Sequence, residues 1–288
     1  MRDFRIALVQ QECYVRRKAR NLAEALTWCR KAADAGAELV CLPELNVTGH
    51  AGSSQMVAQV EPVPDGPSVR AFCKAARELN LIVAAGIAEF DRGAIYNTQF
   101  LVSPDGYLGR QRKVHLSKDE YFHFRGGTAL PVFDLPMARV GVVICYDNHV
   151  PEVQRCLAVG GAEVILAPHA ARFGAWPTTA AGRRNAVRET KDLWRLVHRC
   201  RAYDNGTYQA ICNMVGRGAA GIRGVEANHG GGCLVVDPSG EVIAESRGRD
   251  IREEMLVVDL KAKAVDDVVS NLRTRKPEVF GALCEPTE

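Results

Sequence analysis

The 288-residue sequence predicts an α/β protein whose strands run in both directions. Short apolar runs rich in Val, Ile and Ala alternate with amphipathic segments of helical length, which is typical of sheets covered by helices. Residues 162–167 are apolar at nearly every position, as expected for a strand that is buried on both faces. Later pairs of short runs are joined by turn sequences, and these predict antiparallel hairpins.

The elements follow in order along the chain. We expect helices over residues 17–35, 67–79, 151–160 and 185–204. We expect strands over residues 4–10, 38–43, 81–89, 95–103, 107–114, 139–145, 162–168, 207–214, 232–237, 241–245 and 255–260. The turn from Ser103 to Gly106 joins two of these strands into a hairpin. The segment from Ala171 to Arg184 is polar, and we interpret it as a substrate-specific loop.

The composition agrees with one domain over residues 1–288. Hydrophobic residues make up 47% of the chain, which supports a large core, and no repeat or low-complexity linker divides it. A net charge of +3 gives no indication of nucleic acid or an anionic membrane as a partner. We find no signal region and no membrane-spanning stretch. Many of the ten cysteines lie in apolar segments and none forms CxxC, so we expect a reduced, cytoplasmic protein.

The most informative segment is VGVVICYDNHVPE, from Val140 to Glu152. Its β-branched run ends at Ile144 and a helix is expected to begin near Pro151. Cys145 therefore lies at the C-terminal tip of a strand, where open α/β sheets place their ligands. We expect the positive end of the helix to favour the Cys145 thiolate, the reactive form. The alternative is an unreactive cysteine packed in the core.

Two charged residues lie in or just after other strands. Glu44 follows the apolar run 39–42 and Pro43, so it is either paired at a strand tip or acts as an acid or base. Lys113 lies in the second arm of the hairpin, where alone it would be a surface lysine. Their occurrence together with Cys145, in the order Glu, Lys, Cys, is much more specific than any of the three alone.

These residues make the chain resemble the nitrilase, or carbon–nitrogen hydrolase, superfamily, in its amidase or N-carbamoyl hydrolase branch. The matching pieces are Pro43-Glu44-Leu45, Arg112-Lys113-Val114-His115-Leu116, and Cys145-Tyr146-Asp147 followed by Pro151-Glu152. The resemblance implies a four-layer α-β-β-α sandwich, in which two sheets pack face to face with helices outside. It also implies a homodimer or higher homo-oligomer, with the helix over 185–204 and the C-terminal tail at the contact.

The chemistry needs these residue types for definite reasons. An amide carbonyl is a poor electrophile, so we assign Glu44 to take the thiol proton and pass one to the leaving nitrogen. Lys113 and the backbone N–H of Tyr146 would stabilise the oxyanion. The resemblance suggests Glu120 as a fourth catalytic residue that orients Lys113 or the substrate nitrogen. The alternative for Glu120 is a solvated loop carboxylate beside Lys118.

Other conspicuous residues give weaker signals. Five residues could line the substrate pocket, although ordinary loop packing explains them equally well: Tyr146, His149, His169, Arg172 and Trp176. They favour an acidic or aromatic substrate tail. Asp147 and Glu152 could cap the following helix. The seven histidines lack metal-ligand spacing and the glycine runs form no phosphate-binding motif, so we expect neither a metal nor a cofactor.

The leading hypothesis is a thiol amidohydrolase that acts on a small linear amide or N-carbamoyl compound and releases ammonia. A nitrilase is the first alternative, but nitrilases of the superfamily commonly carry Trp-Glu after the cysteine, where this chain has Tyr146-Asp147. The second alternative is a non-catalytic binding protein on the same scaffold. The helix over 185–204 carries Leu193, Trp194, Leu196 and Val197, more apolar surface than one core-facing stripe requires.

Overall fold

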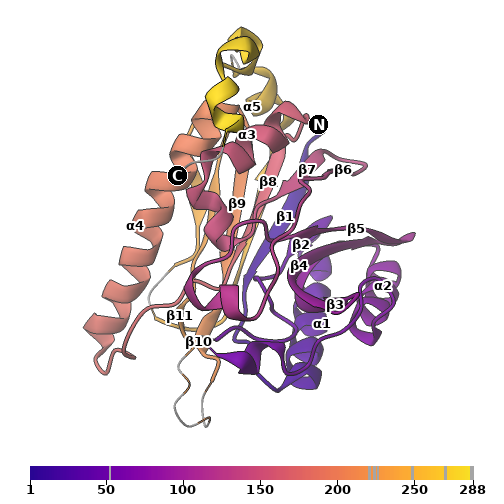
Figure 1. Ribbon diagram of the computed structural model, residues 1–288, viewed down its shortest axis with the longest axis vertical. Coiled ribbons are helices and arrows are strands. Elements are labelled where there is room, and N and C mark those ends of the chain that lie inside the picture. The colour runs from indigo at the N-terminus through magenta and orange to yellow at the C-terminus, as the bar shows by residue number, and fades with distance from the viewer. Residues whose placement is uncertain are drawn as a thin grey trace.

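The computed structural model describes residues 1–51, 53–219, 222, 225, 227–247, 250–268 and 271–285, and it contains two six-stranded sheets (Figure 1). The first sheet has the order β14 (Glu254–Leu260), β1 (Phe4–Gln10), β2 (Leu39–Cys41), β3 (Ile82–Asp91), β4 (Ala94–Ser103) and β5 (Gly106–Arg112). The second has the order β13 (Val242–Glu245), β12 (Cys233–Val236), β9 (Tyr208–Asn213), β8 (Val164–His169), β7 (Arg139–Val142) and β6 (Val132–Asp134).

Both sheets have a parallel centre and antiparallel edges. Strands β1, β2 and β3 pair in parallel, and so do β7, β8 and β9. The hairpin of β4 and β5 and the strands β12 and β13 add antiparallel edges. A separate two-stranded ladder joins β10 (Val215–Arg217) to β11 (Asn228–Gly230). Because parallel strands point the same way, β7 and β8 end at the same edge of their sheet. The end of β2 in the other sheet meets them, since the N–H of Ala170 after β8 binds Glu44 after β2.

Alternation along each strand creates the layers. Ile6 and Leu8 of β1 pack in the cluster between the two sheets, whereas Ala7 and Val9 pack beneath α1 (Lys18–Asp34) and α2 (Pro67–Leu79). The side chains of β8 alternate in the same way, and those of Val164 and Leu166 lie between the sheets. The other face of β8 lies beneath α3 (Pro151–Val159) and α4 (Ala180–Asn205). The result is the α-β-β-α sandwich that the resemblance implied, with α4 along one outer face in Figure 1.

Most predicted elements are present, with three instructive differences. Strands β6, β10 and β11 and the short helix α5 (Ala262–Asp266) were not predicted, because three to five residues carry too little periodicity. Helix α4 begins at Ala180, where the side chain of Thr179 accepts a hydrogen bond from Gly182 N–H. Part of the segment interpreted as a loop is therefore helical. Strands β5 and β7 end at Arg112 and Val142, so Lys113 and Cys145 follow strands rather than lie within them.

Two further findings concern the whole of the described chain. None of its helices is long and apolar enough to cross a membrane. All ten cysteines are free, and Cys13, Cys29, Cys41, Cys212 and Cys233 are buried.

Candidate active site

The structure brings the predicted charged residues together. Glu44 follows β2, Lys113 follows β5, and Glu120 lies in a 3₁₀ turn over Lys118–Phe122. Lys113 Nζ lies 2.8 Å from Glu44 Oε1, and 2.9 and 2.7 Å from the two oxygens of Glu120. All three side chains are almost completely buried, with residue exposures of 0% for Glu44 and 1% for Lys113 and Glu120. Glu120 is therefore not a solvated loop carboxylate.

The charges of this cluster support one another. Burial pushes the pKa of Lys113 down, but the carboxylates of Glu44 and Glu120 overcome this and raise it above its usual value. Burial pushes the pKa of Glu120 up, but His50 and Lys113 hold it well below its usual value. The ammonium and the Glu120 carboxylate are therefore both charged at neutral pH.

The two carboxylates differ in how many donors they accept. Glu120 Oε1 accepts from Lys113 and Asn97, and Oε2 accepts from Lys113 and from both the N–H and the hydroxyl of Ser117. Glu44 Oε1 accepts from Lys113 and Asn97, but among the described residues Oε2 accepts only the N–H of Ala170, at 2.7 Å. A carboxylate offers about four lone-pair positions. Glu120 is therefore saturated, and Glu44 Oε2 keeps one position free.

Cys145 lies near this cluster, because the charges of Glu44, Lys113 and Glu120 all act on the pKa of its thiol. The backbone of Ala170, whose N–H binds Glu44, acts to lower the same pKa. Burial and the charge of Glu44 raise the pKa of this thiol, and the opposing charge of Lys113 does not offset them. The expectation that the following helix favours the thiolate is therefore wrong. A 3₁₀ turn over Cys145–His149 separates the thiol from α3, and burial beside a carboxylate outweighs the helix dipole.

The backbone at Cys145 is strained. Its φ of 48° lies in the left-handed region, which typically costs a residue with a side chain about 1–2 kcal/mol. The side chain of Asp147 ties the turn to the lysine segment, since it accepts the N–H groups of Val114 and His115 at 3.2 and 2.7 Å. Asp147 therefore does not cap α3, whose first residues receive no side-chain cap. The signal was ambiguous because a short acidic residue suits both purposes.

The five predicted pocket residues have different surroundings. Tyr146 and His149 are exposed, with ring centroids 5.2 Å apart. Arg172 forms an ion pair of 3.3 Å with Asp119, and Trp176 packs against Phe173. His169 is buried, with its ring against Trp194 and near His198. The side chain of His169 thus packs inside the protein, and it is the N–H of the next residue, Ala170, that reaches the cluster.

Sequence reasoning missed several neighbours of the cluster. Asn97 donates to both Glu44 and Glu120, at 2.7 and 3.0 Å, and Ser117 holds Glu120. His50 Nε2 lies 3.7 Å from Glu120 Oε1. Asn97 begins a short polar run, Asn97-Thr98-Gln99, inside a strand whose other residues are mostly apolar, and this is the one signal that could have indicated it.

Glu44, His50 and Glu120 also place three potential metal ligands within 4.8 Å of one another. The ammonium of Lys113 already contacts both carboxylates at 2.7–2.9 Å, so it supplies the positive charge that a cation would bring. These residues fit a buried ion-pair cluster better than a metal centre.

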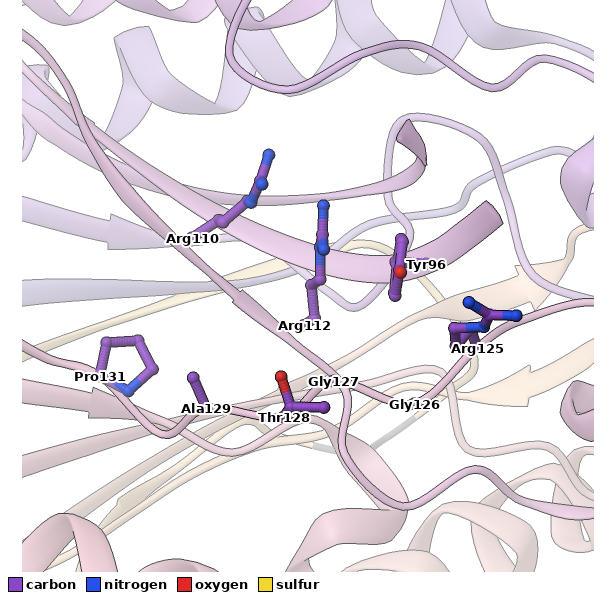
Figure 2. A pocket seen from close by; sticks show the side chains of 9 residues that line it. All are labelled: Tyr96, Arg110, Arg112, Arg125, Gly126, Gly127, Thr128, Ala129 and Pro131. Atoms are coloured by element: carbon purple, nitrogen blue, oxygen red, sulfur yellow. The ribbon is translucent and has the colours of Figure 1, made fainter. Parts of the chain in front are cut away.

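A cavity of about 430 Å³ lies close to Lys113 but contains none of the cluster residues. Figure 2 shows Arg110, Arg112 and Tyr96 along one wall, and residues 125–129 with Pro131 along the other. The two arginines are ion-paired with Glu89 and Asp91. The walls carry no cysteine or carboxylate, so this cavity does not hold the groups needed for acyl transfer.

Comparison with known proteins gives a consistent result. A family model described as carbon-nitrogen hydrolase matches residues 5–268. A nitrilase of Pyrococcus abyssi is 29% identical over 284 residues, covering 96% of this chain and 98% of its own length. An omega-amidase of Homo sapiens is 31% identical over 280 residues, covering 92% and 91%. A solved carbon-nitrogen hydrolase from Helicobacter pylori G27 has the same fold, with a TM-score of 0.82 at 20% identity and coverage of 99% and 100%. The chain therefore belongs to the carbon–nitrogen hydrolase family and is a hydrolytic enzyme.

Proposed function

We propose that the enzyme is a thiol amidohydrolase that cleaves a small linear amide or N-carbamoyl compound through a thioester on Cys145. The observation that carries the proposal is the unequal use of the two carboxylates around Lys113. Glu120 is saturated with donors, whereas Glu44 keeps a free position beside the thiol. Glu44 is therefore the base, and Glu120 is a positioning residue for Lys113.

In the first half-reaction, Glu44 takes the thiol proton as the sulfur attacks the carbonyl carbon. This arrangement suits a thiol whose pKa is raised, because the proton leaves only as the new bond forms. The Tyr146 N–H and Lys113 stabilise the oxyanion. Glu44 then gives the proton to the leaving nitrogen, the C–N bond breaks, and ammonia departs from a Cys145 thioester.

In the second half-reaction, the oxygen of a water molecule attacks the thioester carbon while Glu44 takes a proton from that water. The same two donors stabilise the second oxyanion. When the intermediate collapses, the C–S bond breaks and the proton held by Glu44 returns to the sulfur, so the free acid leaves and the enzyme is restored.

Lys113 has a particular constraint in this mechanism. An ammonium has three N–H donors, and three carboxylate contacts already use them. An oxyanion must therefore replace one contact to Glu120, which keeps its Ser117 and Asn97 donors. The exchange favours the charged transition state over the neutral ground state, which is the condition for catalysis.

The same geometry favours amides and ureido groups over nitriles. The NH₂ of an amide can donate to the free position of Glu44, but a nitrile nitrogen has no proton to donate. A nitrile therefore gains no hydrogen bond at this position, whereas an amide gains one to a charged acceptor, worth about 1.5–3 kcal/mol. We further propose that Tyr146, His149, Arg172 and Trp176 face an acidic or aromatic substrate tail.

The test is ammonia release from four substrates: an N-carbamoyl amino acid, a neutral aliphatic amide, a carbamoylated diamine and a matched nitrile. We expect kcat/KM to be highest for the first two compounds. A preference for the nitrile would overturn the amidase assignment, and a preference for the diamine would overturn the assignment of the tail. Loss of all ammonia release in Cys145→Ala separates catalysis from simple binding on this scaffold.

We also propose that two copies of the chain associate through α4. Trp194 does not belong to the apolar surface expected on this helix, because it packs against the sheet. Leu193 and Leu196 remain available for the contact, since they are 47% and 72% exposed. The neighbouring C-terminal residues Phe280 and Leu283, together with α3 and α4, line a cavity of about 500 Å³. Sedimentation at micromolar concentration should show a dimer that Leu196→Asp disrupts. The matched change at an exposed leucine on β5, Leu108→Asp, should not disrupt it.

A further inference from the structure

A buried polar network lies directly behind the nucleophile, and the mechanism above does not use it. Asn148, three residues after Cys145, is buried, and so are Gln154 of α3 and His169 of β8. The Asn148 amide nitrogen lies 2.9 Å from the Cys145 carbonyl oxygen, 3.4 Å from the Val143 carbonyl oxygen and 3.4 Å from His169 Nε2. Its amide oxygen accepts a hydrogen bond of 2.8 Å from Gln154 Nε2.

The orientation of this amide is determined by its partners. The carbonyl oxygens of Cys145 and Val143 can only accept, so the NH₂ group of Asn148 must face them. The amide oxygen then faces Gln154, which must donate. His169 Nε2 faces an N–H donor and therefore acts as an acceptor, which requires a neutral ring. Burial of the ring lowers the pKa of His169 well below its usual value, in agreement with this.

The network connects the two reacting groups. On one side Asn148 holds the carbonyl of Cys145, whose φ of 48° lies in a region that a residue with a side chain rarely adopts. Such a conformation persists only where the surrounding structure imposes it. On the other side Asn148 contacts His169, and the N–H of the next residue, Ala170, binds Glu44 at 2.7 Å. One amide thus links the turn that carries the nucleophile to the strand end that holds the base.

We propose that Asn148 is a positioning residue that sets the Cys145 thiol against the Glu44 carboxylate, and that Gln154 fixes the direction in which its amide points. This inference rests on the proposed function, because it assigns the network a role in the transfer of a proton from Cys145 to Glu44. Proton transfer needs heavy atoms within hydrogen-bond reach, so a small displacement of either group slows it strongly.

The decisive variant is Gln154→Glu, which keeps the size of the side chain. A carboxylate cannot donate to the Asn148 oxygen, so the amide turns its NH₂ group towards the new carboxylate and presents its own oxygen to the Cys145 carbonyl. Gln154→Met removes the donor without adding a charge, and Asn148→Leu removes the amide itself. The matched control is Gln209→Glu, because Gln209 is equally buried but its oxygen faces His198 rather than Asn148.

Two measurements separate positioning from simple stability. The first measurement is of kcat and KM for an amide that the wild type hydrolyses, with kcat calculated from the concentration of folded enzyme. The second needs no substrate and follows the pH dependence of Cys145 alkylation by iodoacetamide, with the exposed thiols removed by Cys156→Ser, Cys200→Ser and Cys284→Ser. If the wild type hydrolyses no amide, the proposed function fails, whereas the alkylation profile still tests the network.

We expect Gln154→Glu and Gln154→Met to lower kcat by about 10–100-fold with KM within about twofold, and to shift the alkylation profile of Cys145. Gln209→Glu should lower Tm without either change. The proposal is overturned if both Gln154 variants keep kcat and the alkylation profile of the wild type. It is also overturned if Gln209→Glu changes kcat and the profile as much as Gln154→Glu does. Because the two Gln154 variants alter the network without removing Asn148, the test stands even if Asn148→Leu does not fold.

Discussion

Arg112 and Lys113 are neighbours on one hairpin, and each binds two carboxylates. Arg112 is paired with Glu89 and Asp91, and its side chain is 19% exposed. Lys113 is paired with Glu44 and Glu120, and its side chain is 1% exposed. Arg110 joins the first group, so two cations there balance two anions. In the second group one ammonium faces two carboxylates, and the ring of His50 lies 3.7 Å from one of them. Burial is the largest cause of the raised pKa of the Cys145 thiol, and the negative charge of Glu44 is the second.

The comparison distinguishes a structural ion-pair cluster from the cluster to which we assign catalysis. The arginine cluster holds two positive and two negative side chains, so every charge in it has a partner. Its arginines are also partly exposed to solvent. The lysine cluster is buried and holds one more carboxylate than its ammonium can neutralise. Glu44 is the carboxylate with the free lone pair, and we therefore assign it the role of base. The predictions below test this difference, from the largest expected effect to the smallest.

The first prediction concerns the thiol. Cys145→Ala removes the proposed nucleophile and should abolish ammonia release, because without the thiol no thioester can form. It should leave Tm close to that of the wild type, since the change removes a single sulfur atom from a residue of intermediate exposure. Turnover and thermal unfolding are measured on the same preparation. Activity retained in a folded Cys145→Ala enzyme would contradict the mechanism.

The second prediction concerns the base and the ammonium. Glu44→Gln and Lys113→Ala should each lower kcat by about 10²–10³-fold, because one removes the proton acceptor and the other removes an oxyanion donor. The losses should not multiply in the double variant, since the residues act as one unit. Steady-state kinetics of all four proteins test this. A Lys113→Ala enzyme with a raised KM and an unchanged kcat would contradict the oxyanion role.

Much of this site could be predicted from the sequence, because strand tips and motif order locate Glu44, Lys113 and Cys145 without knowledge of the packing. The rest depends on contacts between distant segments. The donors from Asn97 and Ala170 lie 53 and 126 residues from Glu44 along the chain. The sign of the Cys145 pKa shift depends on burial, which periodicity does not give. Asp147 was assigned to the nearest helix, although it binds Val114 and His115, more than 30 residues away.

The third prediction separates thiol ionisation from catalysis. Glu44 raises the pKa of Cys145, so Glu44→Gln should lower that pKa. A pKa lowered by one unit gives about tenfold more thiolate wherever the pH is below the pKa. Iodoacetamide should therefore modify Cys145 faster in Glu44→Gln than in the wild type, although amide hydrolysis is slower.

Alkylation is followed at several pH values in the background that lacks Cys156, Cys200 and Cys284. The wild-type rate should rise throughout the neutral range without a plateau, because the raised pKa keeps the thiol protonated there. Asp91→Asn is the control, since its carboxylate belongs to the arginine cluster. Slower alkylation of Cys145 in Glu44→Gln would show that Glu44 does not raise the pKa of this thiol.

The last prediction concerns Glu89→Gln, which changes a glutamate of the arginine cluster as Glu44→Gln does in the lysine cluster. Glu89 accepts hydrogen bonds from Arg112 and Thr98 and forms an ion pair with Arg110, so its loss leaves Asp91 as the carboxylate partner of both arginines. Removing a charged hydrogen-bond partner of this kind costs about 1–3 kcal/mol of unfolding free energy. The kcat per folded enzyme should stay within about twofold, because the cluster contacts neither Glu44 nor Cys145. Urea unfolding and kinetics on one preparation measure both. A large loss of kcat at full stability would mean that the arginine cluster helps to position Lys113, and that the two clusters act as one.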